Sequence, residues 1–148
     1  MAPSAHSAAK LNPHDPARSP SGSSGGTGAS IAAGYATLGL GTDTGGSVRG
    51  PSTSNGIVGL KPTLGLLSRD GIIPLALSFD TGGPMARNVA DVAVALGVMT
   101  GVDAADAATK ASAGRFATDY TTFLKADAPL SASASPATSW GRTRKWTG

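Results

Sequence analysis

Two serines set among glycines are the residues of this sequence whose types and spacing could do chemistry. Ser47 stands in the run GTDTGGSVR (residues 41–49), and Ser23 lies 24 residues upstream in the run GSSGG (residues 22–26). Glycine lets main-chain N–H groups come close to a reacting atom, and a serine hydroxyl can act as a nucleophile. The two runs predict a polar site built from hydroxyls and main-chain N–H groups, as in many acyl-transfer enzymes.

Three further side chains are predicted to support this site rather than to react. Asp43 and Arg49 flank Ser47 in the second run, and hydrogen bonds from these two residues would hold the loop that carries the serine. Ser24 follows Ser23 directly and is expected to assist in the same way.

Other interpretations of the glycine-rich runs fit the sequence less well. The pattern G-x-S-x-G around Ser24 would mark a nucleophile elbow only after a hydrophobic strand, whereas the segment RSPS precedes it and both histidines lie upstream. The Gly-Lys-Ser/Thr ending of a phosphate-binding loop is missing. A flexible linker would explain residues 22–28 alone, but it does not explain the second run.

Together the runs resemble a known family. The segments NPHDPARSPSGSSGG (12–26), GLGTDTGGSVR (39–49), GLKPT (59–63) and DTGGPMAR (80–87) follow one another as in the amidase signature family. The resemblance extends from about Asn12 to about Lys125. It implies an α/β fold in which this chain supplies the central strip of a mixed sheet surrounded by helices, an incomplete part of the family's domain.

The resemblance also implies a chemistry and roles for individual residues. Such enzymes hydrolyse carboxylic amides without a cofactor or metal, through a serine nucleophile, a serine after a cis peptide bond and a lysine. Ser47 matches the nucleophile and Ser23 the cis serine, so the Gly22–Ser23 bond is expected to be cis and the two hydroxyls are expected to lie within hydrogen-bond reach. The oxyanion hole would be formed by the main-chain N–H groups of Thr44, Gly45, Gly46 and Ser47.

No lysine of this sequence matches the family's base, which lies well upstream of the cis serine. Lys10 precedes the first matching segment, and Lys61 belongs to a segment that resembles a structural element. A serine without a base is a weak nucleophile, so the isolated chain is expected to be inactive. Two hypotheses follow: a fragment of an amidase that associates with the missing part of its domain, or a catalytically dead remnant that at most binds ligands.

Composition limits the other classes of function. The chain has 148 residues, no cysteine and two histidines, which leaves no disulfide, thiol nucleophile or evident metal site. Its 12 basic residues exceed the 9 acidic ones only through Arg142, Arg144 and Lys145, so the net charge of +3 does not indicate a nucleic-acid partner. Because no apolar run is long enough for a membrane span or a signal sequence, we expect a cytoplasmic protein. The resemblance implies that this protein acts on a small-molecule amide. The substrate stays open among aliphatic, aryl and peptide amides and glutamine.

Hydrophobic periodicity predicts the elements that position the serines. We expect a helix over 27–38, a buried strand over 38–42, a second strand over 57–60, and short strands with turns over 63–80. The clearest helix spans 89–100, with Asn88 as its N-cap and an apolar stripe on one face. The predicted organisation is a disordered segment (1–11), a partial amidase-signature domain (12–125) and an irregular tail (126–148).

Overall fold

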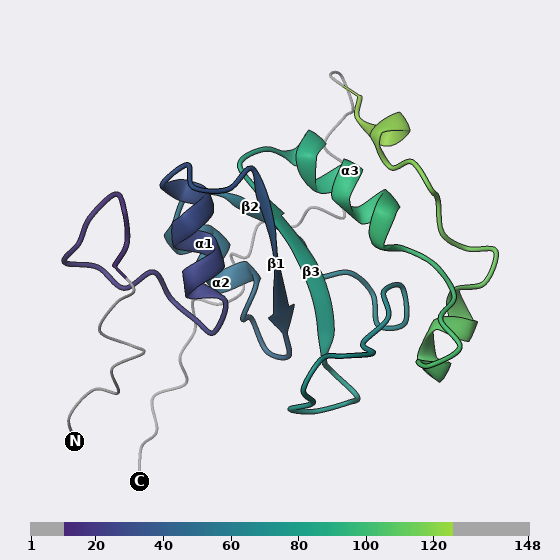
Figure 1. Cartoon of the computed structure of the whole chain (residues 1–148). Helices are drawn as coiled ribbons and strands as arrows, with labels where there is room; N and C mark the ends of the chain where they lie inside the picture. Colours follow the sequence, from purple (N-terminus) through teal and green to yellow (C-terminus); the bar gives the residue numbers. More distant parts are fainter. Residues whose placement is uncertain (1–10, 126–148) are drawn as a thin grey trace, which may run out of the picture.

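The computed structural model of the chain describes residues 11–125, which form a small three-stranded sheet with helices on both of its faces (Figure 1). The predictions for residues 1–10 and for the tail 126–148 lie outside the described residues. The elements follow in the order α1 (Gly25–Ala32), β1 (Leu38–Asp43), α2 (Arg49–Ser54), β2 (Val58–Gly59), β3 (Thr81–Ala86), α3 (Val89–Met99), and two 3-10 helices, η1 (Ala107–Ser112) and η2 (Thr121–Phe123).

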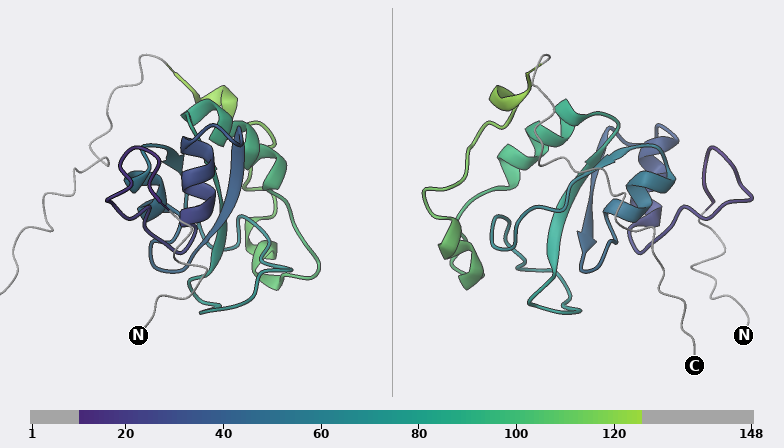
Figure 2. Two further views of the ribbon diagram at one scale, coloured as in Figure 1. Left: turned by 60° about the vertical axis from the view of Figure 1, so that its left-hand side comes forward. Right: turned by 180° about the vertical axis from the view of Figure 1, so that it is seen from behind.

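Strand β3 is the centre of the sheet, because the strand order is β1-β3-β2 and both pairings are antiparallel. All six of its residues are buried. Helices α1 and α2 pack on one face of the sheet, and α3 packs on the opposite face (Figures 1 and 2). The core joins Ile31 of α1, Val48 before α2 and Met85 of β3. The α/β class is therefore confirmed, with a sheet that is antiparallel in the described part.

Strand β1 differs from the prediction of a buried strand. It pairs with β3 on one side only, so it forms an edge of the sheet. Leu38 and Leu40 are 43% and 58% exposed. A short apolar run is compatible with burial but does not require it, because the neighbours that would cover the strand are decided by the tertiary fold.

Glycines on the sheet let α1 lie directly against β1. A Cβ atom added at Gly39 would meet the Thr27 side chain at 2.7 Å, and one at Gly41 would meet Ser24 Oγ at 2.6 Å. Atoms this close cannot be accommodated without a shift of the helix or of these side chains. The small residues of β1 therefore fix the distance between the strand and the start of α1, where the candidate serines lie.

Helix α3 confirms the clearest sequence prediction to within one residue. Its N-cap is Asn88, whose side chain accepts a hydrogen bond from Asp91 N at 2.8 Å. Val92 and Leu96 are buried as predicted, whereas Val89 is exposed. The helix packs one stripe against the sheet and leaves Val98 on its outer side 84% exposed.

Other predicted elements were shifted or missed. The predicted helix over 27–38 begins earlier, at Gly25, and ends at Ala32, because Gly34 adopts a left-handed conformation with φ of 80°. The segment 63–80 contains turns and one isolated bridge between Leu67 and Thr100 instead of short strands. Helix α2 was not predicted because Gly50 and Pro51 lie inside it. Among residues 11–125, no helix is long and apolar enough to cross a bilayer.

Candidate functional site

The loop of residues 20–24 carries Ser23 to the N-terminus of α1. The peptide bond between Gly22 and Ser23 is cis, as the resemblance implies. Ser23 is exposed, and Ser24 is the N-cap residue of α1. Ser24 N donates to the main-chain oxygen of Ser47 at 3.1 Å, so the two serine loops lie side by side.

The hydroxyl of Ser24 binds the outer edge of β1 instead of capping its own helix. Ser24 Oγ lies 3.3 Å from both Thr42 N and Thr42 O, and Thr27 Oγ1 donates to Leu40 O at 3.1 Å. These bonds satisfy main-chain groups that would otherwise be unpaired at a strand edge. In the described residues, the loops are therefore joined through Ser24 rather than through a hydrogen bond between the Ser23 and Ser47 hydroxyls.

A buried asparagine holds the Ser23 loop in place by hydrogen bonds. Asn55 is fully buried, and its Nδ2 donates to Pro20 O at 2.9 Å and to Pro51 O at 2.8 Å. It therefore connects the end of α2 to the residue that begins the serine loop. Asn12 and His14 extend this anchor, because Asn12 Nδ2 donates to Ser54 O at 2.6 Å and His14 Nε2 lies 2.9 Å from Asn55 O.

Asp43, at the end of β1, organises the loop that carries Ser47. Its side chain is fully buried, and its carboxylate accepts hydrogen bonds from Gly46 N at 2.7 Å, Val48 N at 3.1 Å and Arg49 N at 3.3 Å. The chain thus folds around one carboxylate between residues 43 and 49. Ser47 lies in this turn and is half-buried, one residue before Val48, the N-cap of α2.

Arg49 closes the same turn from the outside. Its Nε donates to Asp43 Oδ2 at 3.1 Å, and its second guanidinium nitrogen donates to Asp43 Oδ1 at 3.2 Å. Burial by itself raises the pKa of the Asp43 carboxyl, but the hydrogen bonds from Arg49 and from the main chain outweigh it and hold that pKa well below its usual range. Asp43 and Arg49 are thus bonded to each other and to the main chain of the loop, which is the arrangement that their predicted supporting role requires.

Lys61 is a component of the site that sequence reasoning did not assign. Its Nζ lies 3.3 Å from Asp43 Oδ1 and donates to three main-chain oxygens, those of Asp43, of Thr44 at 3.3 Å and of Phe79 at 2.8 Å. The ammonium group therefore fixes peptide groups directly before Ser47. Its donors are used by the loop and by Phe79, which does not favour Lys61 as a replacement base.

Asp80 holds Thr44 from the other side. The Thr44 hydroxyl donates to Asp80 Oδ1, while Asp80 Oδ2 accepts from the main-chain N–H groups of Leu75 and Ala76, each at 2.8 Å. The Thr44 hydrogen bond is the main cause that lowers the pKa of Asp80, although its burial opposes the shift. The segment DTGGPMAR thus contributes its first residue to the serine loop.

The glycines beside the serines face open space, unlike those of the sheet. A Cβ atom added at Gly22, Gly45 or Gly46 would meet no atom within 4 Å. Gly46 also has φ of 135°, a conformation that side chains rarely adopt. The main chain next to Ser47 can therefore be approached closely. The Gly46 N–H itself donates a hydrogen bond to the Asp43 carboxylate, so this group holds the loop.

A cavity of about 470 Å³ opens beside the loop that carries Ser23, and Ser47 is not among the residues that line it. It is bounded by the start of α1, strand β1, strand β3, the segment 68–72 and the end of α3. The residues that line the cavity include three with hydroxyl groups, Ser23, Ser24 and Thr42. They also include three apolar residues, Leu40, Ile72 and Met99. A cavity with apolar walls and a few polar groups is typical of a small-molecule site.

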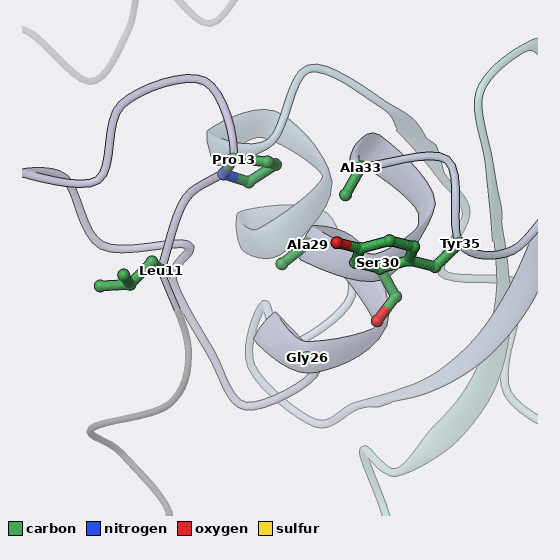
Figure 3. Close-up of a pocket in the computed structure, with 7 residues that line it drawn as sticks. All are labelled: Leu11, Pro13, Gly26, Ala29, Ser30, Ala33 and Tyr35. Carbon is green, nitrogen blue, oxygen red and sulfur yellow. The ribbon is translucent and has the colours of Figure 1, made fainter.

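A second cavity lies on the outer side of α1 and lacks the candidate residues. It measures about 330 Å³ and is lined by the segment around Leu11 and Pro13, by small residues of α1 and by Tyr35 (Figure 3). Its polar groups in the lining are the hydroxyls of Ser30 and Tyr35. Neither serine loop reaches it, so the chemistry is better placed in the larger cavity.

Comparison with known proteins identifies the family. The family model described as "Amidase" matches residues 6–129, which include all the described residues. The chain belongs to the amidase family. The match begins a few residues before, and ends a few residues after, the stretch from Asn12 to Lys125 over which the motifs were recognised.

Relatives of this amidase-family chain include proteins of two kinds. One subunit of glutamyl-tRNA(Gln) amidotransferase, from Chloroflexus aurantiacus, is 53% identical over 116 residues, which are 78% of this chain and 23% of the relative. The native peptide amidase from Stenotrophomonas maltophilia is 52% identical, with a TM-score of 0.73 over 76% of this chain and 23% of that structure. An amidase family protein from Bacillus anthracis gives 45% identity and a TM-score of 0.75, over 78% and 23%. The chain thus spans about a quarter of the length of these amidase relatives.

The sequence contained only part of the information needed to assign several residues of this candidate site. Lys61 and Asp80 were noticed as members of motifs, but their partners are 18 and 36 residues away in the chain. Asn55 gave no signal, because a single asparagine between a helix and a turn resembles an ordinary helix end.

Proposed function

We propose that this segment carries the acyl-transfer serines of an amidase that hydrolyses the C–N bond of a carboxylic amide. The observation that supports the proposal is the hydrogen bond from Ser24 N to Ser47 O, which joins the two serine-bearing loops, although of the two candidate serines only Ser23 lines the cavity. The names of the relatives, a peptide amidase and a component of an amidotransferase, concern amide groups and support the same class of substrate.

In the proposed reaction, Ser47 is the nucleophile. Its Oγ bonds to the carbonyl carbon, the C–N bond breaks, and the serine proton passes through the Ser23 hydroxyl to the leaving nitrogen. Water then hydrolyses the ester on Ser47 and releases the acid. The N–H groups of Thr44, Gly45 and Ser47 would stabilise the negative charge on the carbonyl oxygen, since the fourth predicted donor, Gly46, is directed to Asp43.

The base of this reaction has no counterpart in this sequence, so the 148-residue chain alone is expected to turn over amides slowly. Loss of general-base assistance costs about 10² to 10⁴ in rate. We propose that the active form packs this segment against the remainder of an amidase domain. Ile73, Leu75 and Val98 support this, because they are 92%, 81% and 84% exposed and would be covered by such packing.

The test uses an activated ester, p-nitrophenyl acetate, because its leaving group needs no proton. We expect acetylation of the peptide that contains Ser47, detected by mass spectrometry, and its loss in Ser47→Ala. Ser78→Ala, at an exposed serine in the turn before β3, is the matched control and should keep the acetyl group on Ser47. Equal labelling of Ser47→Ala and the wild type would reject Ser47 as the nucleophile. Binding of amides without acetylation would favour the alternative of a catalytically inactive binding module.

A further inference from the structure

Asp70 is the one charged residue among the described residues that line the larger cavity. The rest of the lining consists of hydroxyl-bearing, apolar and glycine residues. Asp70 enters from the segment 68–72 between β2 and β3, whereas Ser23 belongs to the loop before α1. A carboxylate and the candidate proton-carrying serine therefore share one cavity.

The nearby basic side chains of the described segment are committed elsewhere. Arg69, the neighbour of Asp70, binds Asp106 with Nε at 2.8 Å and with its second guanidinium nitrogen at 2.7 Å, and it also donates to Leu77 O. Lys61 and Arg49 both contact Asp43. Within residues 11–125, no ion pair joins the Asp70 carboxylate to a basic side chain.

The main chain around Asp70 is fixed by hydrogen bonds, at the side of the cavity that this exposed residue lines. Asp70 N donates to Ser68 Oγ at 3.1 Å, and Ser68 Oγ in turn donates to Asp103 Oδ2 at 2.6 Å. Arg69 N donates to Asp106 Oδ2 at 3.0 Å. These bonds tie the segment 68–70 to the residues just before η1, in the part of the molecule where Figure 1 shows the connection from β2 running between β3 and η1.

We propose that Asp70 gives this cavity a preference for amides that carry a positively charged group. The inference rests on the proposed function, because it assigns the cavity to the amide substrate. A single carboxylate in a cleft attracts a cation, and apolar walls such as those formed by Leu40 and Met99 strengthen its field. Asp70 is a specificity residue in this proposal and takes no part in bond breaking.

The experiment compares two ligands of almost equal shape, 6-aminohexanamide and heptanamide. Their dissociation constants are measured by chemical-shift titration of the isotope-labelled chain. In Asp70→Asn we expect the affinity for 6-aminohexanamide, relative to that for heptanamide, to decrease by about fivefold. A change of this size is typical of the loss of a partly exposed ion pair. Asp70→Glu should retain the wild-type ratio, and high salt should reduce it.

Asp15→Asn is the matched control, because Asp15 pairs with Arg18 and does not line the cavity. An affinity ratio that is the same in the wild type, Asp70→Asn and Asp15→Asn overturns the proposal. The experiment measures binding and does not depend on the reaction. Ser47→Ala should therefore keep the preference for the cationic amide. If Ser47 is not acetylated but the preference still depends on Asp70, the hydrolase proposal fails and the binding preference stands. If Ser47 is acetylated and no preference is found, the reverse holds.

Discussion

Lys61 and Asp43 are joined through two different groups of the aspartate. The lysine Nζ lies 3.3 Å from the Asp43 carboxylate and also donates to the Asp43 main-chain oxygen. The Asp43 side chain is fully buried, and the Lys61 side chain is 22% exposed. One lysine therefore neutralises the carboxylate that organises the Ser47 loop and satisfies the peptide group that leads into it.

Lys61→Met should destabilise the fold by about 2 kcal/mol or more. The variant leaves the main-chain oxygens of Asp43 and Thr44, which are partly buried, and that of Phe79 without this donor. An unsatisfied buried polar group costs about 1 to 3 kcal/mol. Urea unfolding followed by circular dichroism measures the change. Lys110→Met, at an exposed lysine in η1, is the control and should change stability by less than about 0.5 kcal/mol. Equal stability of the two variants would contradict a holding role for Lys61.

The pH dependence of unfolding should report the network around Asp43. Its pKa in the folded chain lies well below the value of about 3.9 for an unfolded chain, so its contribution to stability is complete above about pH 5. That contribution decreases as the pH falls below about 4 and continues to decrease towards the folded-state pKa. Each such group adds up to about 1.4 kcal/mol per pH unit to the slope.

Asp43→Asn tests this assignment. The variant should be less stable at pH 7 by about 3 kcal/mol, because Arg49 and Lys61 lose their shared counter-charge. Its unfolding free energy should fall less steeply between about pH 4 and pH 2 than that of the wild type. The slope need not vanish, since Asp106 also has a lowered pKa. Parallel curves for the two proteins would show that Asp43 is not a source of the acid sensitivity.

Two glycine substitutions should separate packing from chemistry. A Cβ atom at Gly83 would overlap the Leu60 main-chain oxygen, so Gly83→Ala should cost about 3 kcal/mol or more of stability. Gly45→Ala meets open space and should leave stability almost unchanged. Because its methyl group enters the space that a substrate carbonyl would use, acetylation of Ser47 by p-nitrophenyl acetate should slow by about tenfold or more. Rapid acetylation of a folded Gly45→Ala chain would argue against an oxyanion hole at this main chain.

Asn88→Ala should weaken the start of α3 by about 1 kcal/mol. The side chain of Asn88 accepts from Asp91 N, and this bond satisfies one of the free N–H groups of the first helical turn. Thermal unfolding should show the loss as a lower midpoint, and Asn88→Asp should retain most of the stability because aspartate is also a good N-cap. An unchanged midpoint in Asn88→Ala would mean that packing of Val92 and Leu96 alone fixes the helix start.

The sequence by itself determined the features that depend on local chemistry. The cap and apolar stripe of α3 could be predicted because both are set by residues three or four positions apart. The motifs around Ser23 and Ser47 likewise identified the family, and Asp43 could be assigned to its own loop because its partners in that loop, such as Arg49, lie within six residues.

Only the tertiary structure decided the contacts between distant segments. It placed β1 at an edge of the sheet, joined Lys61 to the loop 43–44, and brought Asp70 into the cavity that Ser23 lines. These relationships depend on how closely helices and strands can pack. Close packing is possible here because Gly39, Gly41 and Gly83 have no side chain, and the need for a glycine at each position becomes visible only when the opposing segment is in place. Local sequence patterns carry no information about which segment lies opposite a glycine, so these contacts could be identified only in the tertiary structure.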